Sequence, residues 1–308
     1  MRRILFLLAL AAAVALAGAC GSPEDEGSSP KGAPEKAEKP TAVETVQVAY
    51  RETAAEQTAK TSFGMTTTTP SADPQGTGQA APMTMRMSGQ GVVDFSGAAS
   101  SMTMEMFGMG NMEMRQVGNM IYLKMPEDFQ AQMPGSKPWM EMDLDAAYGE
   151  QYGASPMGMQ GGAAGDPTRQ LEYLRGVSDS VEKIGEEKVR GVPTTRYEAI
   201  VDLKKEAAAG GPEAKKAQEQ IVKQLGTSKL PVEVWIDDQN RVRRYAIDMT
   251  VPMPQNASAP GMPKDGEIRT QMIAEYYDFG APVNVQAPSP DQTMDASKLL
   301  AGQQPVAR

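Results

Sequence analysis

The spacing of apolar residues changes along the chain, and it predicts a helix followed by strands. From Val43 to Ala59, apolar residues recur at steps of three and four positions, which is typical of an amphipathic helix. From Met83 to Phe95 the step falls to two, with methionine, glycine, valine and phenylalanine at odd positions and mostly polar residues between them. Such alternation predicts an antiparallel strand with one apolar face and one solvated face.

The same two-residue pattern predicts further strands downstream. Methionines alternate with polar residues at Met102–Met106 and Met112–Met114, and a Gly118-Asn119 turn leads into Met120–Met125. The remaining strands are expected at Val181–Ile184, Val189–Val192, Thr195–Leu203, Val232–Ile236, Tyr245–Val251 and Glu267–Phe279.

Two more helices are expected, at Asp166–Gly176 and Lys204–Leu225, so the pattern predicts an α+β domain with an antiparallel sheet. Three short helices are too few to cover one apolar face of a sheet this large, so we expect part of that face to line a cavity. The glycine-rich segment Tyr148–Asp166 is the expected gate. The candidate ligand-binding residues of the cavity are Met83, Met85, Met87, Met102, Met104, Met106, Met112, Met114, Val234, Ile247 and Met249.

The N-terminus has the features of a secretion signal, predicted to span residues 1–19. Arg2 and Arg3 precede an apolar run that ends at Leu16, and small residues follow it. The run is shorter than the roughly 20 residues that span a bilayer. Cys20 is the sole cysteine of the chain, and residues 16–20 resemble a lipobox. That resemblance implies that Cys20 receives a diacylglycerol anchor and becomes the mature N-terminus.

The segment after Cys20 is predicted to be a tether, because residues 21–40 hold no apolar side chain larger than alanine. A domain at 41–288 and a flexible tail at 289–308 complete the expected organisation. Cleavage would remove Arg2 and Arg3 and leave 28 basic and 39 acidic residues, a net charge of −11. This balance argues against nucleic acid and against adhesion to anionic headgroups. The expected partner is therefore the outer face of the cytoplasmic membrane, through the lipid, and any protein partner stays open.

The chain lacks the residues that common catalytic sites need. It has no histidine, and its one cysteine is assigned to the lipid, so Ser-His-Asp and Cys-His arrangements are excluded. The acidic pairs Asp237-Asp238 and Glu186-Glu187 fall in predicted turns, where carboxylates are usually solvated. No phosphate-binding or calcium-binding loop motif occurs. We expect a non-enzymatic protein without a cofactor.

Several short phrases resemble actinobacterial LppX/LprG-type lipoproteins, which belong to the LolA-like half-barrel group. These phrases are Gln116–Tyr122, Lys137–Trp139, Gly191–Tyr197, Val234–Asp237 and Tyr277–Val283. The resemblance runs from about Thr41 to Pro288. It implies a curved antiparallel sheet wrapped around a few helices, with an apolar cavity that holds acylated lipids or glycolipids. The group has no fixed set of binding residues, so none is carried over.

The chain contains 23 methionines, which leave three functions open. The leading hypothesis is a lipoprotein that binds, and by extension transfers, a hydrophobic or acylated lipid, because flexible methionines repack around varied partners. The dense cluster Met102–Met114 could instead bind Cu(I) through soft thioether sulfur. The absence of histidine and the continuation of the pattern into Val93 and Phe95 favour the lipid. The third hypothesis is a ligand-free interaction module that docks a partner through Lys204–Leu225.

Overall fold

The computed structural model describes most of the domain that follows the predicted tether. The described residues are 40–70, 82–96, 99–106, 110–131, 137–143, 177–204, 225–253 and 266–295, with positions 174, 219, 222 and 223. They fall in a compact unit, Pro40–Arg308. The predicted signal, Cys20, the tether and the gate Tyr148–Asp166 lie outside the described residues, as do all but Leu174 of the predicted helix Asp166–Gly176 and most of Lys204–Leu225.

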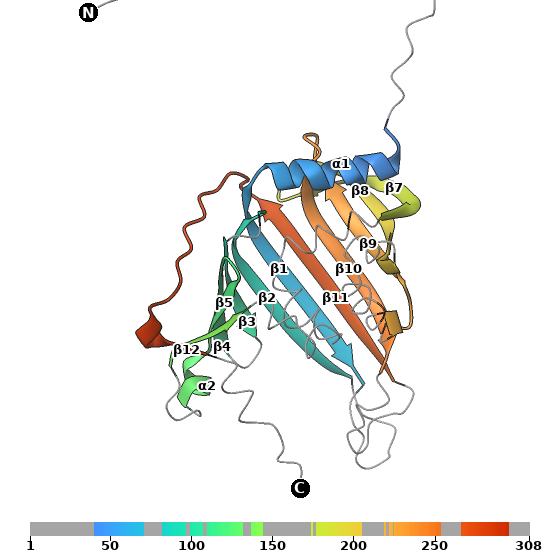
Figure 1. The fold of residues 1–308 in the computed structure, drawn as a ribbon. Coiled ribbons are helices and arrows are strands. Elements are labelled where there is room, and N and C mark those ends of the chain that lie inside the picture. The colour runs from blue at the N-terminus through green and yellow to red at the C-terminus, as the bar shows by residue number, and fades with distance from the viewer. Residues whose placement is uncertain are drawn as a thin grey trace, which may run out of the picture. The chain divides into compact units, whose positions relative to one another are not determined.

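The described strands form one large sheet. Their bounds are β1 Thr58–Thr69, β2 Met83–Asp94, β3 Ala99–Met106, β4 Gly110–Val117, β5 Met120–Lys124, β6 Trp139–Asp143, β7 Val177–Val189, β8 Val192–Asp202, β9 Lys229–Ile236, β10 Val242–Pro252, β11 Glu267–Tyr277 and β12 Thr293–Asp295. The order is β12-β6-β5-β4-β3-β2-β1-β11-β10-β9-β8-β7, twelve strands in all. Every neighbouring pair is antiparallel except β12 and β6. In Figure 1, β3 to β6 turn away from the plane of β1, β11 and β10.

Helix α1, Ala42–Ala55, begins at a capping box. The backbone N–H of Glu44 donates to Thr41 Oγ1 at 3.2 Å, and the backbone N–H of Thr41 donates to the Glu44 carboxylate at 2.8 Å. Its buried face carries Val46, Ala49 and Thr53, and the helix packs against β7, β9 and β10. The hydroxyl of Thr53 accepts the backbone N–H of Val242 at 2.8 Å, which fixes the helix to the start of β10.

The predicted N-terminal helix was four residues too long, and β1 was missed. The backbone of Gln57 turns to φ +65°, and the chain enters β1 at Thr58. Two of the buried residues of β1 are threonines, Thr61 and Thr67, so the alternation of apolar and polar residues is hidden in the sequence. The apolar positions that remain, including Phe63, are too few to predict a strand.

The predicted strand Val189–Val192 was wrong, because the chain turns there. Arg190 and Gly191 both have positive φ, +49° and +81°, as the tightest hairpin turns require. The turn joins β7 to β8, and β8 then follows the predicted strand Thr195–Leu203 closely. Strands β2 to β5 and β9 to β11 confirm seven further strand predictions to within a few residues, and the predicted strand Val181–Ile184 is part of the longer β7.

Part of the segment expected to be a flexible tail, 289–308, is ordered. A single turn of 3-10 helix, η2 (Pro290–Gln292), leads into β12, which pairs with β6. The connection from β11 to β12, which we name the strap (residues 280–292), appears as the dark red trace of Figure 1. The ammonium of Lys137 donates to the carbonyls of Pro290 and Thr293, each at 2.8 Å, and the guanidinium of Arg115 donates to the carbonyl of Gln286 at 3.3 Å. These contacts order the strap although its sequence looks like a tail.

Candidate functional site

The sheet has two chemically different faces, which the strand register defines residue by residue. We name the face that carries Phe63 and Met65 the inner face, and the face that carries Ser62 and Gly64 the outer face. Along β1–β6, β8, β9, β11 and β10 from Tyr245 on, the register places no charged side chain on the inner face.

All eleven residues predicted to line a cavity lie on the inner face by register. Five of them are buried: Met102, Met104, Met114, Val234 and Ile247. Met87, Met112 and Met249 are half-buried. Met83 and Met85, at the start of β2, keep 54% and 49% of their surface exposed. Met106 is placed by its register alone. The structure thus places the predicted residues on one face of the sheet, and their contact with a ligand stays a prediction.

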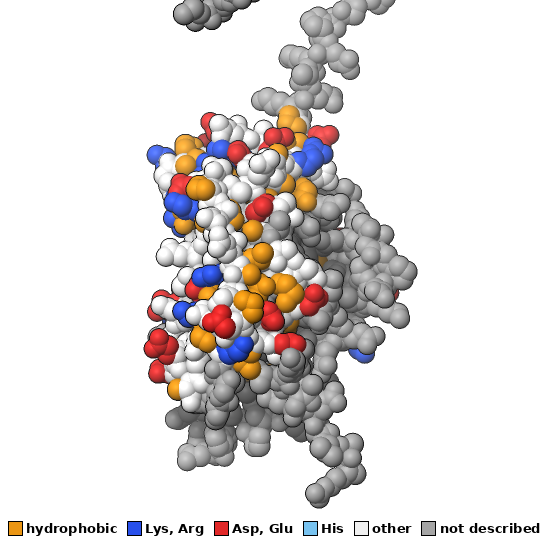
Figure 2. Space-filling model, turned by 60° about the vertical axis from the view of Figure 1, so that its left-hand side comes forward, with side chains coloured by type: hydrophobic (Ala, Val, Ile, Leu, Met, Phe, Trp, Pro, Cys, Tyr) orange, Lys and Arg blue, Asp and Glu red, His pale blue; other side chains and the backbone are white. Residues whose placement is uncertain are grey.

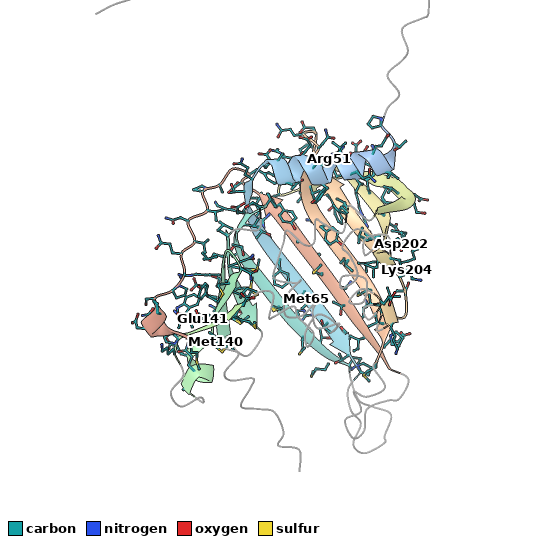
Figure 3. All side chains as sticks on the ribbon, in the orientation of Figure 1. Arg51, Met65, Met140, Glu141, Asp202 and Lys204 are labelled. Carbon is teal, nitrogen blue, oxygen red and sulfur yellow. The ribbon has the colours of Figure 1, made fainter. Side chains whose placement is uncertain are left out.

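Apolar residues of neighbouring strands form continuous rows across the inner face. The first row, which we name row 1, crosses eight strands from β7 to β3 through Val181, Ala199, Val232, Ile247, Met272, Met65, Met87 and Met106. Its members are aliphatic as far as β10 and methionine from β11 on. Figure 3 shows Met65 in the middle of the sheet.

A second row, row 2, extends the methionine surface to the other edge of the sheet. It passes through Tyr276, Thr61, Gly91, Met102, Met114, Leu123, Met140 and Met294. The sequence analysis missed Met65, Met272, Met140 and Met294. Each belongs to a segment whose own pattern is short or mixed, so only the pairing with neighbouring strands reveals its face.

Two glycines of β2 permit a close approach of β3. A Cβ atom on Gly91 would lie 1.9 Å from the carbonyl oxygen of Ser101, and one on Gly89 would lie 2.9 Å from that of Thr103. Since glycine alone has no such atom, these positions allow the sheet to bend sharply between β2 and β3. The bend brings the methionines of β3 and β4 toward those of β1 and β2.

The outer face is charged, and several of its charged side chains form ion pairs. Glu275 accepts hydrogen bonds from Arg190 and Arg244, each at 2.8 Å, and Arg196 pairs with Glu233. The indole N–H of Trp235 donates to Glu187 at 2.9 Å, and this bond, with the nearby Arg244, lowers the pKa of Glu187. Over the described surface visible in Figure 2, acidic and basic side chains are intermingled.

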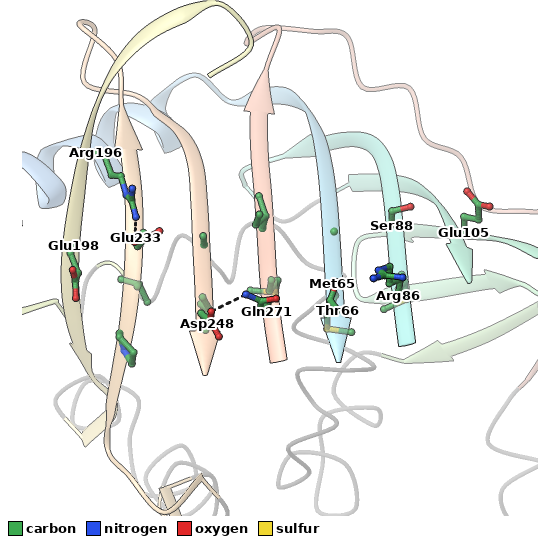
Figure 4. A pocket seen from close by; sticks show the side chains of 18 residues that line it. Met65, Thr66, Arg86, Ser88, Glu105, Arg196, Glu198, Glu233, Asp248 and Gln271 are labelled. Atoms are coloured by element: carbon green, nitrogen blue, oxygen red, sulfur yellow. Dashed lines mark hydrogen bonds and ion pairs between the residues drawn. The ribbon is translucent and has the colours of Figure 1, made fainter. Parts of the chain in front are cut away.

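The outer face also holds a trough of about 880 Å³. Its lining includes Gly64, Ala246 and Ile273. The charged residues that line it include Arg86, Glu105, Arg196, Glu198 and Glu233 (Figure 4). Of the predicted cavity residues, only Met87 and Ile247 border it. This trough is therefore not the predicted methionine-lined cavity, because most of its lining faces the other way.

Asp237 and Glu187, one residue from each acidic pair noted in the sequence, have charged partners in the structure. Asp237, predicted to be solvated, has a fully buried side chain that pairs with Arg241 at 2.9 Å and Arg243 at 2.7 Å. Burial opposes its ionisation, but hydrogen bonds from the Arg241 backbone and from both guanidinium groups outweigh it, so the pKa of Asp237 lies below its ordinary value. Among the described residues, no group of three or more Cys, Asp or Glu is placed to hold a metal ion. In the same part of the chain, no helix is long and apolar enough to cross a membrane.

Comparison with known proteins finds similar structures and one similar sequence. The Mycobacterium tuberculosis lipoprotein LppX is 15% identical with a TM-score of 0.42, and the match covers 78% of this chain and 98% of LppX. LprF of Mycobacterium bovis is 13% identical with a TM-score of 0.36, over 80% of this chain and 97% of LprF. A lipoprotein-sorting domain of Vibrio parahaemolyticus is 10% identical with a TM-score of 0.23, over 81% of this chain and 94% of that domain. Two of these structural neighbours, LppX and LprF, are lipoproteins of mycobacteria.

The structures similar to this chain thus include LppX, a member of the family that the sequence resembles. No protein-family profile matches the chain. An uncharacterised 31.2 kDa protein of Streptomyces griseus, from the rplA-rplJ intergenic region, is 26% identical over 205 residues. That match covers 62% of this chain and spans 58% of the length of the relative.

Proposed function

We propose that the chain is an extracytoplasmic lipoprotein, anchored to the outer face of the cytoplasmic membrane through Cys20, whose inner face binds a hydrophobic or acylated lipid without catalysis. The observation that carries the proposal is the pair of apolar rows across the inner face. They cross many strands without a charged side chain, and the exposed methionines Met83 and Met85 lie on the same face.

The rows suit a flexible hydrocarbon chain. Adjacent strands are about 4.8 Å apart, so the methionine part of row 1, from Met272 to Met106, spans roughly 14 Å. Burial of ten methylenes would contribute roughly 8 kcal/mol, the size of micromolar binding before ordering costs are subtracted. Unbranched thioether side chains adjust to chains of different shape.

The sequence predicts two helices, at Asp166–Gly176 and Lys204–Leu225, which fall mostly outside the described residues. In this proposal they would close the inner face into an apolar cavity. The ligand would pass the exposed Met83 and Met85, with Tyr148–Asp166 as the gate. Transfer would be release through the same opening into an acceptor. In this mechanism the lipid partitions into the cavity, and the motion of the gate admits and releases it.

The test compares two faces of one strand in the full chain carrying Cys20→Ala, which blocks lipidation. The Met83→Glu, Met85→Glu variant adds two charges to the inner face of β2 at exposed positions, so it should fold. The Thr84→Glu, Ser88→Glu variant adds the same charge to exposed positions of the outer face. We expect the first to lower lipid affinity at least tenfold and the second to leave it unchanged, in native mass spectrometry and calorimetry. Equal loss in both variants would place binding elsewhere.

Cu(I) binding is the second candidate, and one observation favours it. Met102 lies opposite Met114, and Met104 lies opposite Met112, on β3 and β4. Directly paired residues have Cβ atoms about 5 Å apart, close enough for two thioethers to share an ion. Native mass spectrometry of the same protein with Cu(I) separates the candidates. One bound copper and no lipid would favour the metal, and neither ligand would favour an interaction module.

A further inference from the structure

A large aliphatic side chain is exposed in the outer trough. Ile273 of β11 keeps 46% of its surface exposed, although β11 lies in the interior of the twelve-stranded sheet. Its direct cross-strand neighbours on this face are Ala246 of β10 and Gly64 of β1, the two smallest residue types. A Cβ atom on Gly64 would have no neighbour within 4 Å. There is therefore open space beside Ile273, next to apolar surface that no side chain of the neighbouring strands covers.

Acidic side chains lie on both sides of this apolar patch. Across β7, β8 and β9, Glu182, Glu198 and Glu233 are direct neighbours, and Glu105 of β3 lies at the other end of the same row. Like charges directly opposite one another destabilise a sheet. Of these four glutamates, only Glu233 has an ion-pair partner among the described residues, namely Arg196. Folding alone does not favour this arrangement, and a cationic partner would relieve the repulsion.

The lining of the trough as a whole is acidic. It includes four carboxylates and two guanidinium groups, which belong to Glu105, Glu198, Glu233, Asp248, Arg86 and Arg196 (Figure 4). An apolar centre with a polar rim is the usual organisation of a protein–protein interface. The charge of the rim favours a basic partner. A second copy of this chain fits poorly, because the chain has a net charge of −9 and two acidic rims would repel each other.

The length of the row suits an extended segment of polypeptide. From Glu198 to Glu105 the row crosses seven strands, so it is about 29 Å long at about 4.8 Å per strand. An extended segment of about nine residues has the same length, and its alternate side chains point to one side. A central side chain of such a segment would reach Ile273 while residues toward its two ends reach the carboxylates.

We propose that the outer trough is a docking site for a basic segment of a partner protein. One aliphatic side chain of the partner packs beside Ile273, and lysine or arginine side chains pair with Glu198 and Glu105. The site lies on the face opposite to rows 1 and 2, so it does not depend on the proposed lipid binding. A partner docked there leaves the inner face free.

The experiment measures the affinity of the full chain carrying Cys20→Ala for a synthetic peptide at low ionic strength. The probe is acetyl-Lys-Ser-Lys-Ser-Leu-Ser-Lys-Ser-Lys-amide, which places its leucine and its lysines on one side when extended. Two matched peptides replace the leucine by serine, or all four lysines by glutamate. Fluorescence anisotropy of the labelled peptides gives the dissociation constants.

The first pair of variants tests the apolar patch. Gly64→Val with Ala246→Val fills the space on both sides of Ile273, and valine suits a strand, so this variant should fold. Thr84→Val with Thr103→Val, the control, places two valines at exposed outer positions that do not line the trough. We expect the filled variant to bind the leucine peptide at least tenfold more weakly and the control to bind it unchanged. Thermal unfolding verifies that both variants are folded.

The second pair tests the acidic rim. Glu105→Gln with Glu198→Gln removes two carboxylates from the row, whereas Glu52→Gln with Glu127→Gln removes two exposed carboxylates of α1 and α2. We expect the first variant to weaken binding about fivefold and to reduce its dependence on salt. The second should leave both unchanged, because general attraction to an acidic protein does not place the peptide.

The peptides themselves give the remaining outcomes. We expect the unsubstituted protein to bind the leucine peptide at least tenfold more tightly than the serine peptide, and not to bind the glutamate peptide. Equal binding of the leucine and serine peptides, binding of none of them, or equal loss in a variant and its control would overturn the docking site. A dimer in sedimentation that the filled variant dissociates would make the occupant a second copy and overturn the basic partner. None of these outcomes bears on lipid binding, so the two proposals fail separately.

Discussion

At the scale of single residues, the shape of the inner face depends on positions where the presence of a Cβ atom would prevent two strands from approaching each other. Gly91 lets β3 approach β2, whereas Gly64, on the outer face of β1, has no neighbour within 4 Å of a Cβ placed there. The sequence shows both glycines inside alternating or threonine-rich segments and does not distinguish them. The neighbouring strand determines which of the two positions requires glycine, and the local sequence pattern contains no information about that neighbour.

Gly91→Ala should therefore destabilise the protein, by about 2–3 kcal/mol, because its methyl group would meet the backbone of Ser101. Gly64→Ala should be neutral or stabilising by up to about 1 kcal/mol, because alanine loses less entropy on folding. Urea unfolding of both variants gives the comparison. Equal stability of the two would contradict the close approach of β3.

Asp237 should make stability depend on pH. Its pKa in the folded protein is lowered by the Arg241 and Arg243 hydrogen bonds against the opposing effect of burial. The contribution of ionised Asp237 to stability is therefore complete above about pH 3.9, the pKa of an aspartate in the unfolded chain. It is lost as the pH falls below that value and through the lower pKa of the folded protein. Asp237→Asn should cost about 3 kcal/mol at pH 7. Below about pH 4, the free energy of unfolding of the variant, measured with urea, should also fall less steeply than that of the unsubstituted protein. Parallel curves of this free energy against pH for the two proteins would refute the role of Asp237.

At the scale of elements, two-residue alternation predicted most of the strands, while boundaries and short strands failed for identifiable reasons. The helix was overextended because nothing in the residues after Ala55 signals the turn at Gln57. The hairpin at Arg190 was misread because valines flank it on both sides. β6 and β12 are five and three residues long, too short to show a period, and β12 exists only through its pairing and the strap.

The strap should protect the edge of the sheet. Lys137→Met removes the donor to the carbonyls of Pro290 and Thr293, so β12 should separate from β6 more often. We expect a loss of about 1–2 kcal/mol and faster hydrogen exchange at the amides of β6. Lys124→Met, an exposed lysine of neighbouring β5, is the matched control and should leave exchange unchanged. Identical exchange in both variants would show that the strap does not hold β12.

At the scale of the whole molecule, the sequence predicted the class of the fold and the face of every candidate methionine. It could not predict that row 1 and row 2 run across the sheet, because strand order brings β11 beside β1 from opposite ends of the chain. It also gave no sign of the outer trough, whose lining residues come from several neighbouring strands. Cavity formation depends on burial in three dimensions, and a one-dimensional pattern reports only one strand at a time.

The anchor is a separate prediction at this scale. Cys20→Ser should release the protein from the membrane fraction into the soluble extracytoplasmic fraction, because the lipid supplies the attachment. Fractionation and immunoblotting of cells that express each form give the measurement. A membrane-bound Cys20→Ser variant would mean that another segment holds the protein there.

The central claim is that the methionine-rich inner face binds lipid, and native mass spectrometry of the full chain carrying Cys20→Ala tests it most directly. The protein should retain a small-molecule mass that dissociates as an acyl lipid, and the Met83→Glu, Met85→Glu variant should lose it. The Thr84→Glu, Ser88→Glu variant should keep it. A protein without lipid after incubation with acyl-ester lipids, or a lipid that survives the inner-face charges, would contradict the account.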